Sequence, residues 1–338
     1  MTPFRLPVPA DFILARDVCS YGYFLLEPNH WDPAGHTFRT TIDLGPRAVT
    51  LRISQGAVPD PERTHTYRSI REKAGTPLSV RPDAKLSPEE KKIARRAIER
   101  MLHLNETQER IGEFHKLDKR FRKTGRGRLM RSPTLFEDVL KTVTSCNVQW
   151  PSTIIMNRRL CEVVGRESAS GLHAFPTAER LAAMRPASLR ARCRVGYRDA
   201  RMIELARMFA RGEVDPAWIE NPATPDDDLW DALLEWPGIG PYAAANIMQL
   251  LGRYHRLPLD TESVRHGRDL LGFKGSSARI MKRVHRHYEP FGQHRFRSYW
   301  FELWEFYERK RGPAWTWERE TTGKTFTASQ LADEPRTK

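Results

Sequence analysis

The sequence has few cysteines, no long apolar run and a shortage of acidic residues. Its four cysteines, at positions 19, 146, 161 and 193, match no zinc or iron–sulfur spacing, and none follows Cys193. This excludes a cysteine cluster in the C-terminal part, and free thiols in a reducing compartment are expected. No stretch approaches the roughly 20 apolar residues of a membrane span, and no charged head precedes an apolar signal core. We therefore expect no membrane contact, no metal site and a cytoplasmic location.

The shortage of acidic residues leaves a large positive charge. The 338 residues include 56 Lys and Arg against 42 Asp and Glu, which gives a formal net charge of +14. This balance suits a polyanionic partner, and nucleic acid is the first candidate, although a basic solvated surface gives the same count. The segment 116–131 is especially basic and could follow phosphates or be a charged connection. The length is sufficient for two or three subdomains.

Residues 1–86 have the pattern of a β-rich domain. Segments 38–44 and 48–53 alternate and are rich in β-branched residues, and 12–15 and 21–26 are further candidate strands. Helical patterns dominate residues 87–311, beginning with a capping box at Ser87. Residues 312–338 are polar and are expected to form a loose tail. The expected fold class is α+β, mostly α: a small N-terminal antiparallel sheet followed by an all-helical core of two helical subdomains.

Residues 225–252 predict two helices joined by a tight turn, Pro-Gly-Ile-Gly. Gly238 and Gly240 have no side chains, so backbone N–H groups there can approach a phosphate, and the second helix adds its dipole. An ordinary αα-hairpin, in which glycine serves packing, has the same pattern. Asp260 follows this hairpin and precedes a further helical segment, so it could be only the N-cap of that helix.

The stretch from Pro237 to Asp260, PGIGPY…LD, resembles the helix-hairpin-helix/Gly-Pro-Asp superfamily of DNA glycosylases. The resemblance covers roughly residues 90–310. It implies that Asp260 is the catalytic carboxylate and that the backbone at Gly238 and Gly240 holds DNA phosphates. The implied partner is double-stranded DNA with a damaged base, bound by a monomer. No cofactor is implied, although a structural monovalent cation at the hairpin carbonyls is common in the family.

Three further residues match DNA-contacting positions of the 8-oxoguanine branch. Asn147 falls where an interhelical asparagine fills the gap left by the extruded nucleotide, although Asn also satisfies helix-end backbone groups. Tyr197 and Arg198 match a Gly-Tyr-Arg motif whose tyrosine wedges into the duplex and whose arginine contacts the orphaned base. Extruding a base costs a few kcal/mol, so wedging groups are required. The arginine that reads an orphan cytosine would fall near Ser152, which puts strict pairing with cytosine in doubt.

The residue after the hairpin turn distinguishes two mechanisms. Bifunctional members carry a lysine two residues after the last glycine, and its amine forms a Schiff base with the sugar. Here that residue is Tyr242, whose phenol cannot form the adduct but whose ring can stack on a flipped base. The pattern is similar to 3-methyladenine glycosylase II, which uses water. Trp300 and Trp304 on the last long helix are further base-pocket candidates, although an aromatic-rich helix also suits a core.

The sequence therefore predicts a monofunctional base-excision-repair DNA glycosylase, a hydrolase acting on a flipped damaged base. An alkylated purine is favoured because cationic bases stack well on aromatic rings. Two alternatives stay open. One is a bifunctional 8-oxoguanine-type glycosylase/lyase, for which Lys141 or Lys274 has no positional support. The other is a non-catalytic duplex-binding module.

Overall fold

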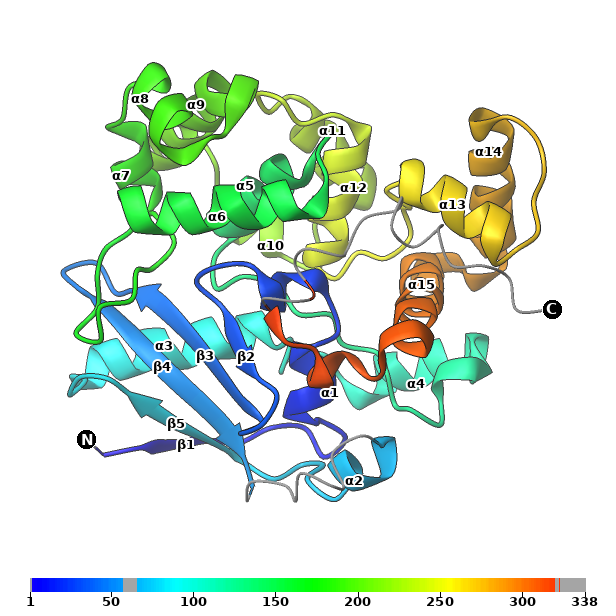
Figure 1. Cartoon of the computed structure of the whole chain (residues 1–338), viewed down its shortest axis with the longest axis horizontal. Helices are drawn as coiled ribbons and strands as arrows, with labels where there is room; N and C mark the ends of the chain where they lie inside the picture. Colours follow the sequence, from blue (N-terminus) through cyan, green and yellow to red (C-terminus); the bar gives the residue numbers. More distant parts are fainter. Residues whose placement is uncertain (1, 57–65, 320–321, 323–338) are drawn as a thin grey trace.

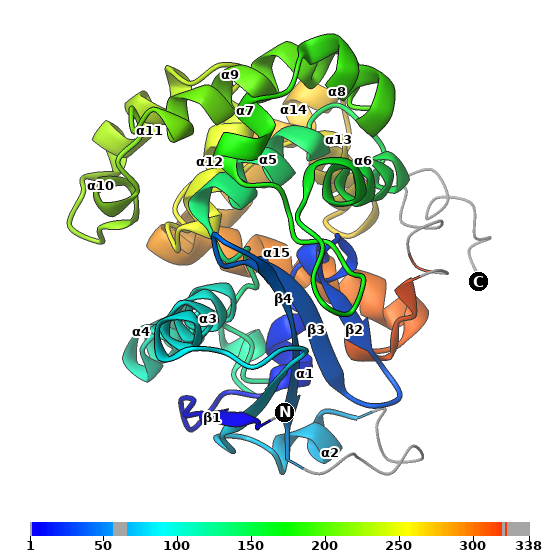
Figure 2. The same ribbon diagram turned by 90° about the vertical axis from the view of Figure 1, so that its left-hand side faces the viewer.

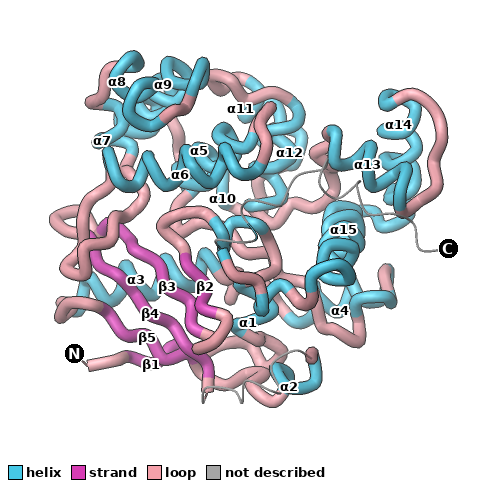
Figure 3. The backbone as a smooth tube through the Cα atoms, in the orientation of Figure 1, coloured by secondary structure: helices cyan, strands magenta, loops and turns pink. Residues whose placement is uncertain are grey.

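The computed structural model describes residues 2–56, 66–319 and 322, and it combines one sheet with many helices (Figure 1 and Figure 3). The five-stranded antiparallel sheet has the order β1-β5-β4-β3-β2. Its strands are β1 (Phe4–Leu6), β2 (His30–Asp32), β3 (Thr37–Asp43), β4 (Ala48–Gln55) and β5 (Leu78–Pro82). The predicted fold class, α+β and mostly α with a small N-terminal antiparallel sheet, is confirmed.

Two of the four expected strands form, and two expectations are wrong. Segments 38–44 and 48–53 correspond to β3 and β4. Residues 12–15 and 21–26 instead contribute to helix α1 (Leu14–Val18) and the 3₁₀ turn η1 (Gly22–Leu25). Every side chain from 12 to 26 is buried, and a continuous buried run has no period that separates a strand from a short helix.

Helices make up most of the chain after the sheet. The capping box at Ser87 is confirmed: its hydroxyl accepts from the Glu90 N–H at 3.2 Å, and Glu90 Oε2 accepts from the Ser87 N–H at 2.7 Å. No helix in the described ranges is long and apolar enough to cross a membrane. The helices and 3₁₀ turns are α2 (Tyr67–Arg71), α3 (Pro88–Met101), α4 (Gln108–Leu117), η3 (Lys119–Phe121), α5 (Leu135–Ser145), α6 (Trp150–Val164), α7 (Ala178–Ala182), α8 (Pro186–Cys193), η4 (Gly196–Arg198), α9 (Asp199–Ala210), α10 (Pro216–Glu220), α11 (Asp226–Leu234), α12 (Pro241–Leu250), α13 (Thr261–Asp269), α14 (Ser277–Tyr288), η5 (Glu289–His294), α15 (Arg295–Arg311) and η6 (Ala314–Thr316).

Buried apolar side chains form two cores that do not follow the expected boundary at residue 86. The first core joins the sheet, α1 and α3 to α13, α14 and α15, and so combines the start of the chain with its end. The second core lies within the helices α5 to α12. Figure 2 shows the sheet, α1 and α3 below the helices α5 to α12. The N-terminal sheet therefore shares its core with the C-terminal helices.

The described residues after Arg311 pack into the first core, which corrects the expectation of a loose tail from residue 312. Trp315 is 1% exposed and Trp317 is 4% exposed. The indole N–H of Trp31 donates to the carbonyl oxygen of Trp315 at 2.8 Å. The rest of that expectation, residues 320–321 and 323–338, lies outside the described residues.

Candidate active site

Asp260 lies at the start of α13, and that helix holds one of its two carboxylate oxygens. Oδ1 accepts hydrogen bonds from the N–H groups of Glu262 at 3.0 Å and Ser263 at 3.1 Å, and from the Ser263 hydroxyl at 3.3 Å. Every hydrogen bond that the described residues make to this carboxylate goes to Oδ1. The predicted N-cap geometry is therefore present, and Oδ2 remains available to a ligand.

A cavity of about 430 Å³ lies beside Asp260. Tyr242, Trp300 and Trp304 line it together with Asp260, so the structure brings the predicted base pocket and the predicted catalytic residue to one place. The lining side chains come from five separate parts of the chain, within the ranges 21–23, 145–150, 242–246, 258–262 and 296–307.

Aromatic rings form one side of this cavity and are fixed by hydrogen bonds. The rings of Trp300 and Trp304 stack with centroids 5.3 Å apart, and the ring of Tyr21 lies 4.7 Å from that of Trp300. The indole N–H of Trp300 donates to the carbonyl oxygen of Ser20 at 2.8 Å, and the indole N–H of Trp304 donates to the carbonyl oxygen of Cys19 at 3.0 Å. Trp304 is 0% exposed, so it belongs to the core as well as to the cavity wall.

Two further residues of the cavity, Tyr21 and Glu262, are functional candidates that the sequence does not predict. The Tyr21 hydroxyl donates to Asn246 Oδ1 at 3.5 Å, a contact between residues 225 positions apart for which the sequence carries no local signal. Glu262 faces the same cavity, and its Oε1 accepts from the Tyr307 hydroxyl at 2.5 Å. Its position two residues after Asp260, in the first turn of the same helix, was the available signal.

Burial controls the ionisation of the cavity residues. It raises the pKa of the Asp260 carboxyl; the N–H of Ser263 opposes this shift, and the negative charge of Glu262 adds to it. Burial, followed by the charge of Asp260, also raises the pKa of the Tyr242 hydroxyl. Burial likewise raises the pKa of Tyr21. Both phenols therefore stay protonated at neutral pH and can donate hydrogen bonds.

The hairpin turn between α11 and α12 needs glycine at one position and leaves open space at another. Gly238 has φ 76°, and a Cβ atom there would lie 2.7 Å from Cδ of Arg201. Gly240 has φ −100° and caps the ten-residue helix α12. A Cβ atom at Gly240 would meet nothing within 4 Å. Free space before the positive end of a helix is what an approaching anion requires.

The three predicted duplex-contacting residues differ in exposure. Asn147 is exposed between α5 and α6 with φ 52°, and its side chain makes no hydrogen bond within the described ranges. Tyr197 is 56% exposed. Arg198 is only 6% exposed; its Nε donates to the Val143 carbonyl at 3.2 Å and its Nη2 to the Cys146 carbonyl. The expected contact of Arg198 with an orphaned base does not match this geometry, because the guanidinium holds the end of α5 next to Asn147.

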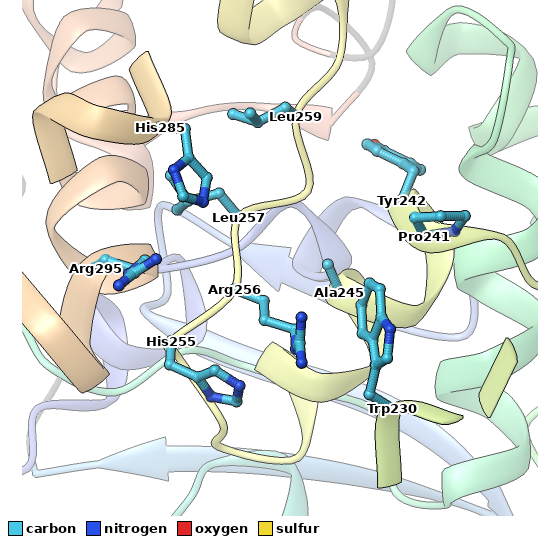
Figure 4. A pocket seen from close by; sticks show the side chains of 10 residues that line it. All are labelled: Trp230, Pro241, Tyr242, Ala245, His255, Arg256, Leu257, Leu259, His285 and Arg295. Carbon is cyan, nitrogen blue, oxygen red and sulfur yellow. The ribbon is translucent and has the colours of Figure 1, made fainter. Parts of the chain in front are cut away.

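Tyr242 also lines a second groove, of about 390 Å³, which Figure 4 shows from close by. Of the described residues, Tyr242 alone lines both this groove and the cavity beside Asp260. The Arg256 guanidinium lies 4.1 Å from the ring centroid of Trp230 and donates to Asp227 Oδ1 at 2.8 Å. The other charged or titratable lining residues are His255, His285 and Arg295.

No lysine is among the described residues that line the cavity beside Asp260. Lys141 is fully buried, and its Nζ lies 2.6 Å from Glu137 Oε1. Lys274 is exposed in the connection between α13 and α14. Neither alternative amine is therefore placed to attack a sugar at Asp260. Within the described ranges, no three His, Cys, Asp or Glu side chains gather as a metal site requires.

Solved DNA glycosylases share this arrangement of elements. The 3-methyladenine DNA-glycosylase of Archaeoglobus fulgidus matches with a TM-score of 0.61 and 20% identity, over 92% of this chain and 99% of its own. The 8-oxoguanine glycosylase/lyase of Clostridium acetobutylicum matches with a TM-score of 0.59 and 17% identity, over 85% and 93%. MBOgg1 in complex with a low affinity DNA ligand matches with a TM-score of 0.65 and 17% identity, over 92% and 97%. No protein-family model and no curated protein matches the sequence. These likenesses establish that the chain shares its fold with these DNA glycosylases.

Proposed function

We propose that this protein is a DNA glycosylase that hydrolyses the N-glycosidic bond of a damaged base flipped out of duplex DNA. The observation that carries the proposal is the position of Asp260. One of its oxygens is bound to α13, the other is free, and a cavity with aromatic walls lies beside it. A carboxylate in this position stabilises the positive charge that develops on the sugar as the base leaves. It also orients the attacking water or accepts its proton.

The proposed reaction has no lyase step. A Schiff base requires an amine at the sugar. Tyr242 occupies the position after the hairpin, and no lysine is among the described lining residues of the cavity. Water is therefore the proposed nucleophile, and the product is an abasic site in an intact strand.

The proposed substrate class is an alkylated, electron-poor purine. Both charged residues that line the cavity, Asp260 and Glu262, are carboxylates. Nine aromatic residues line it as well: Tyr21, Tyr23, Trp150, Tyr242, Phe296, Tyr299, Trp300, Trp304 and Tyr307. No Arg, Lys or His is among its described lining residues. A cationic base gains from stacking on such rings and from the negative charge. A neutral base gains only from the stacking.

Duplex DNA is the proposed partner, and the residues outside the cavity fit contacts with it. The open backbone at Gly240 and the start of α12 suit a phosphate. Exposed Asn147 and Tyr197 suit the gap and the base step left by the extruded nucleotide. Arg198 is a positioning residue in this proposal, because it fixes the loop that carries Asn147.

The experiment that tests this function uses duplexes with a single lesion, incubated with the wild-type protein or with Asp260→Asn. The panel contains 3-methyladenine-type, 1-methyladenine, hypoxanthine, uracil and 8-oxoguanine lesions, each read with and without hot alkali. We expect cleavage only after alkali, strongest for an alkylated purine and absent in the variant. Borohydride treatment of the same reactions should trap no protein–DNA adduct.

Each other outcome overturns a different part of the proposal. Strand breaks without alkali, or a borohydride adduct, would establish a lyase and contradict the assignment of Tyr242. Release of 8-oxoguanine alone would contradict the substrate class. Binding of every duplex without release of any base would leave a non-catalytic duplex-binding module.

A further inference from the structure

Three arginines lie side by side on the outer face of the sheet. In the register of β3 and β4, Arg39 lies opposite Arg52, and in the register of β4 and β5, Arg52 lies opposite Arg81. These three residues are called the arginine row below. Arg52 and Arg81 are exposed, and Arg39 is half-buried. The other face of the sheet contributes to the first core together with α3, which lies behind the sheet in Figure 1.

No described acidic side chain neutralises the positive charge of the arginine row. Within the described part of the chain, none of its three guanidinium groups forms a hydrogen bond or an ion pair. Like charges directly opposite each other on neighbouring strands destabilise a sheet. A ligand that carries negative charge would remove this repulsion.

A pocket of about 330 Å³ adjoins the row and is lined by basic and polar side chains. Arg52 and Arg81 line it together with Lys73, and no acidic residue is among its described lining residues. Asp32 is close to this region but does not line the pocket. Its Oδ1 already accepts from the N–H groups of Ala34 at 3.0 Å and Gly35 at 3.1 Å. The pocket is therefore positively charged on the side where the row enters it.

His36 gives an independent indication that this pocket receives a ligand. The side chain lines the pocket, is 5% exposed, and its Nε2 has no hydrogen-bond partner among the described residues. A buried polar atom without a partner is unfavourable, so a ligand that pairs with Nε2 is stabilised. His36 also has φ 46°, a conformation that few residues other than glycine adopt. Burial, with a contribution from Lys73, lowers its pKa to about 4, so the ring is neutral.

We propose that the arginine row and its pocket bind the phosphate backbone of a second nucleic-acid segment. Guanidinium groups match phosphate oxygens in geometry and charge. The row spans two strand spacings, roughly 10 Å at about 4.8 Å each, which is longer than one phosphate group requires. A polynucleotide strand presents a negative charge about every 3.4 Å along its axis and can engage the whole row.

The site is separate from the cavity beside Asp260. The two share no described lining residue, and in Figure 1 the sheet lies below and to the left of the hairpin helices α11 and α12. One protein molecule can then hold a damaged duplex at the hairpin and a second segment at the sheet. The proposal goes beyond the glycosylase function and does not depend on it.

A duplex-capture experiment tests the second site. A short biotinylated undamaged duplex on streptavidin beads is saturated with the full-length protein, and a fluorescent duplex is then added at several salt concentrations. The row variant replaces Arg39, Arg52 and Arg81 by Gln. We expect the wild-type protein to retain the fluorescent duplex and the row variant to retain roughly tenfold less or lower, with a salt slope reduced by about 2 to 3.

A matched variant with the same change in net charge distinguishes the effect of the arginine row from the effect of total charge. It replaces Lys92, Arg96 and Lys282 by Gln, three exposed cations with no ion pair among the described residues. This variant should capture the second duplex like the wild type. His36→Asn, which suits the left-handed backbone, should reduce capture several-fold without loss of folding by circular dichroism.

The outcomes separate the second site from the glycosylase function. Base release under single-turnover conditions should be equal in the wild-type protein and the row variant, and capture without any base release would support the site while overturning the function. Equal capture by the wild type and the row variant would overturn the site. Binding of inorganic phosphate, seen by ³¹P line broadening, without capture of DNA would also overturn it.

Discussion

The two carboxylate oxygens of Asp260 have different roles: Oδ1 caps a helix, and Oδ2 is available for the proposed reaction. Oδ1 caps α13 through two N–H groups, and this fixes the direction of the carboxylate before any substrate binds. Because burial raises its pKa, the folded protein holds the proton more tightly than the unfolded chain does. The stability contribution of the protonated carboxyl is therefore lost as pH rises through the raised pKa, and at neutral pH the ionised group destabilises the fold.

Asp260→Asn should greatly slow base release and stabilise the protein at neutral pH. Asparagine is a good N-cap and keeps the hydrogen bonds of α13, but it has no charge to desolvate. Single-turnover release should fall by roughly 10² to 10⁴, and the melting temperature at pH 7 should rise. At a pH below the raised pKa the two proteins should melt alike. A variant that melts below the wild type at pH 7 would contradict the assigned direction of the shift.

The rate of base release should fall at acidic pH, because the reaction requires the ionised form of Asp260. The midpoint of this fall should lie above the ordinary Asp pKa of 3.8, because burial raises the pKa of Asp260. Glu262 contributes to this shift through its negative charge. Glu262→Gln should therefore move this midpoint to lower pH, as measured by single-turnover release across a pH series. An unchanged midpoint would show that Glu262 does not affect the pKa of Asp260.

At the scale of the element, the hairpin offers a comparison between two glycines of one turn. Gly238→Ala places a side chain at positive φ and against Arg201, which should destabilise the protein by about 1–2 kcal/mol or more. Gly240→Ala meets nothing within 4 Å and should leave the melting temperature nearly unchanged.

Duplex binding should fall in both hairpin variants for different reasons. Gly238→Ala distorts the turn, whereas the new methyl group of Gly240→Ala occupies the space that a phosphate needs. Fluorescence anisotropy with undamaged duplex, combined with thermal unfolding of each variant, measures the two effects separately. Unchanged affinity in Gly240→Ala would exclude a phosphate contact at the start of α12.

Local elements with strong turn and cap signals could be predicted from the sequence, and contacts between distant elements could not. The hairpin and the capping box at Ser87 depend on residues within a few positions of each other, so spacing alone identifies them. Tyr21 reaches the cavity through a contact with Asn246, far away in the sequence. Arg198 shows a different limit: a Gly-Tyr-Arg motif places the residue but does not say whether its side chain points outward or binds the carbonyls at the end of α5.

At the scale of the whole molecule, the composition of the segment after α15 gives a wrong prediction of its packing. The polar residues after Arg311 predict a loose tail, yet two tryptophans among them enter the first core. The average polarity of a segment does not show whether it contains a few large apolar side chains that pack into a core. The boundary expected at residue 86 differs from the packing for a related reason, because sheet and C-terminal helices share one core.

Replacing Trp315 tests whether this segment holds the first core together. Trp315→Ala should destabilise the protein by roughly 3–5 kcal/mol, because it empties a fully buried site. Trp315→Phe retains much of the volume and should have a smaller effect. Chemical denaturation with a two-state fit measures both variants. An alanine variant as stable as the wild type would show that residues 312–319 are dispensable for the core.

The composition of the cavity wall has a consequence for the chain during its synthesis. Its lining begins at Tyr21 and ends at Tyr307, and the core behind it needs α13, α14 and α15 as well as the sheet. A growing chain on the ribosome therefore has a complete hairpin long before it has a complete cavity. Under the proposed function, the hairpin is therefore available to contact DNA before the cavity that would accept a base is complete, because the cavity needs residues up to Tyr307.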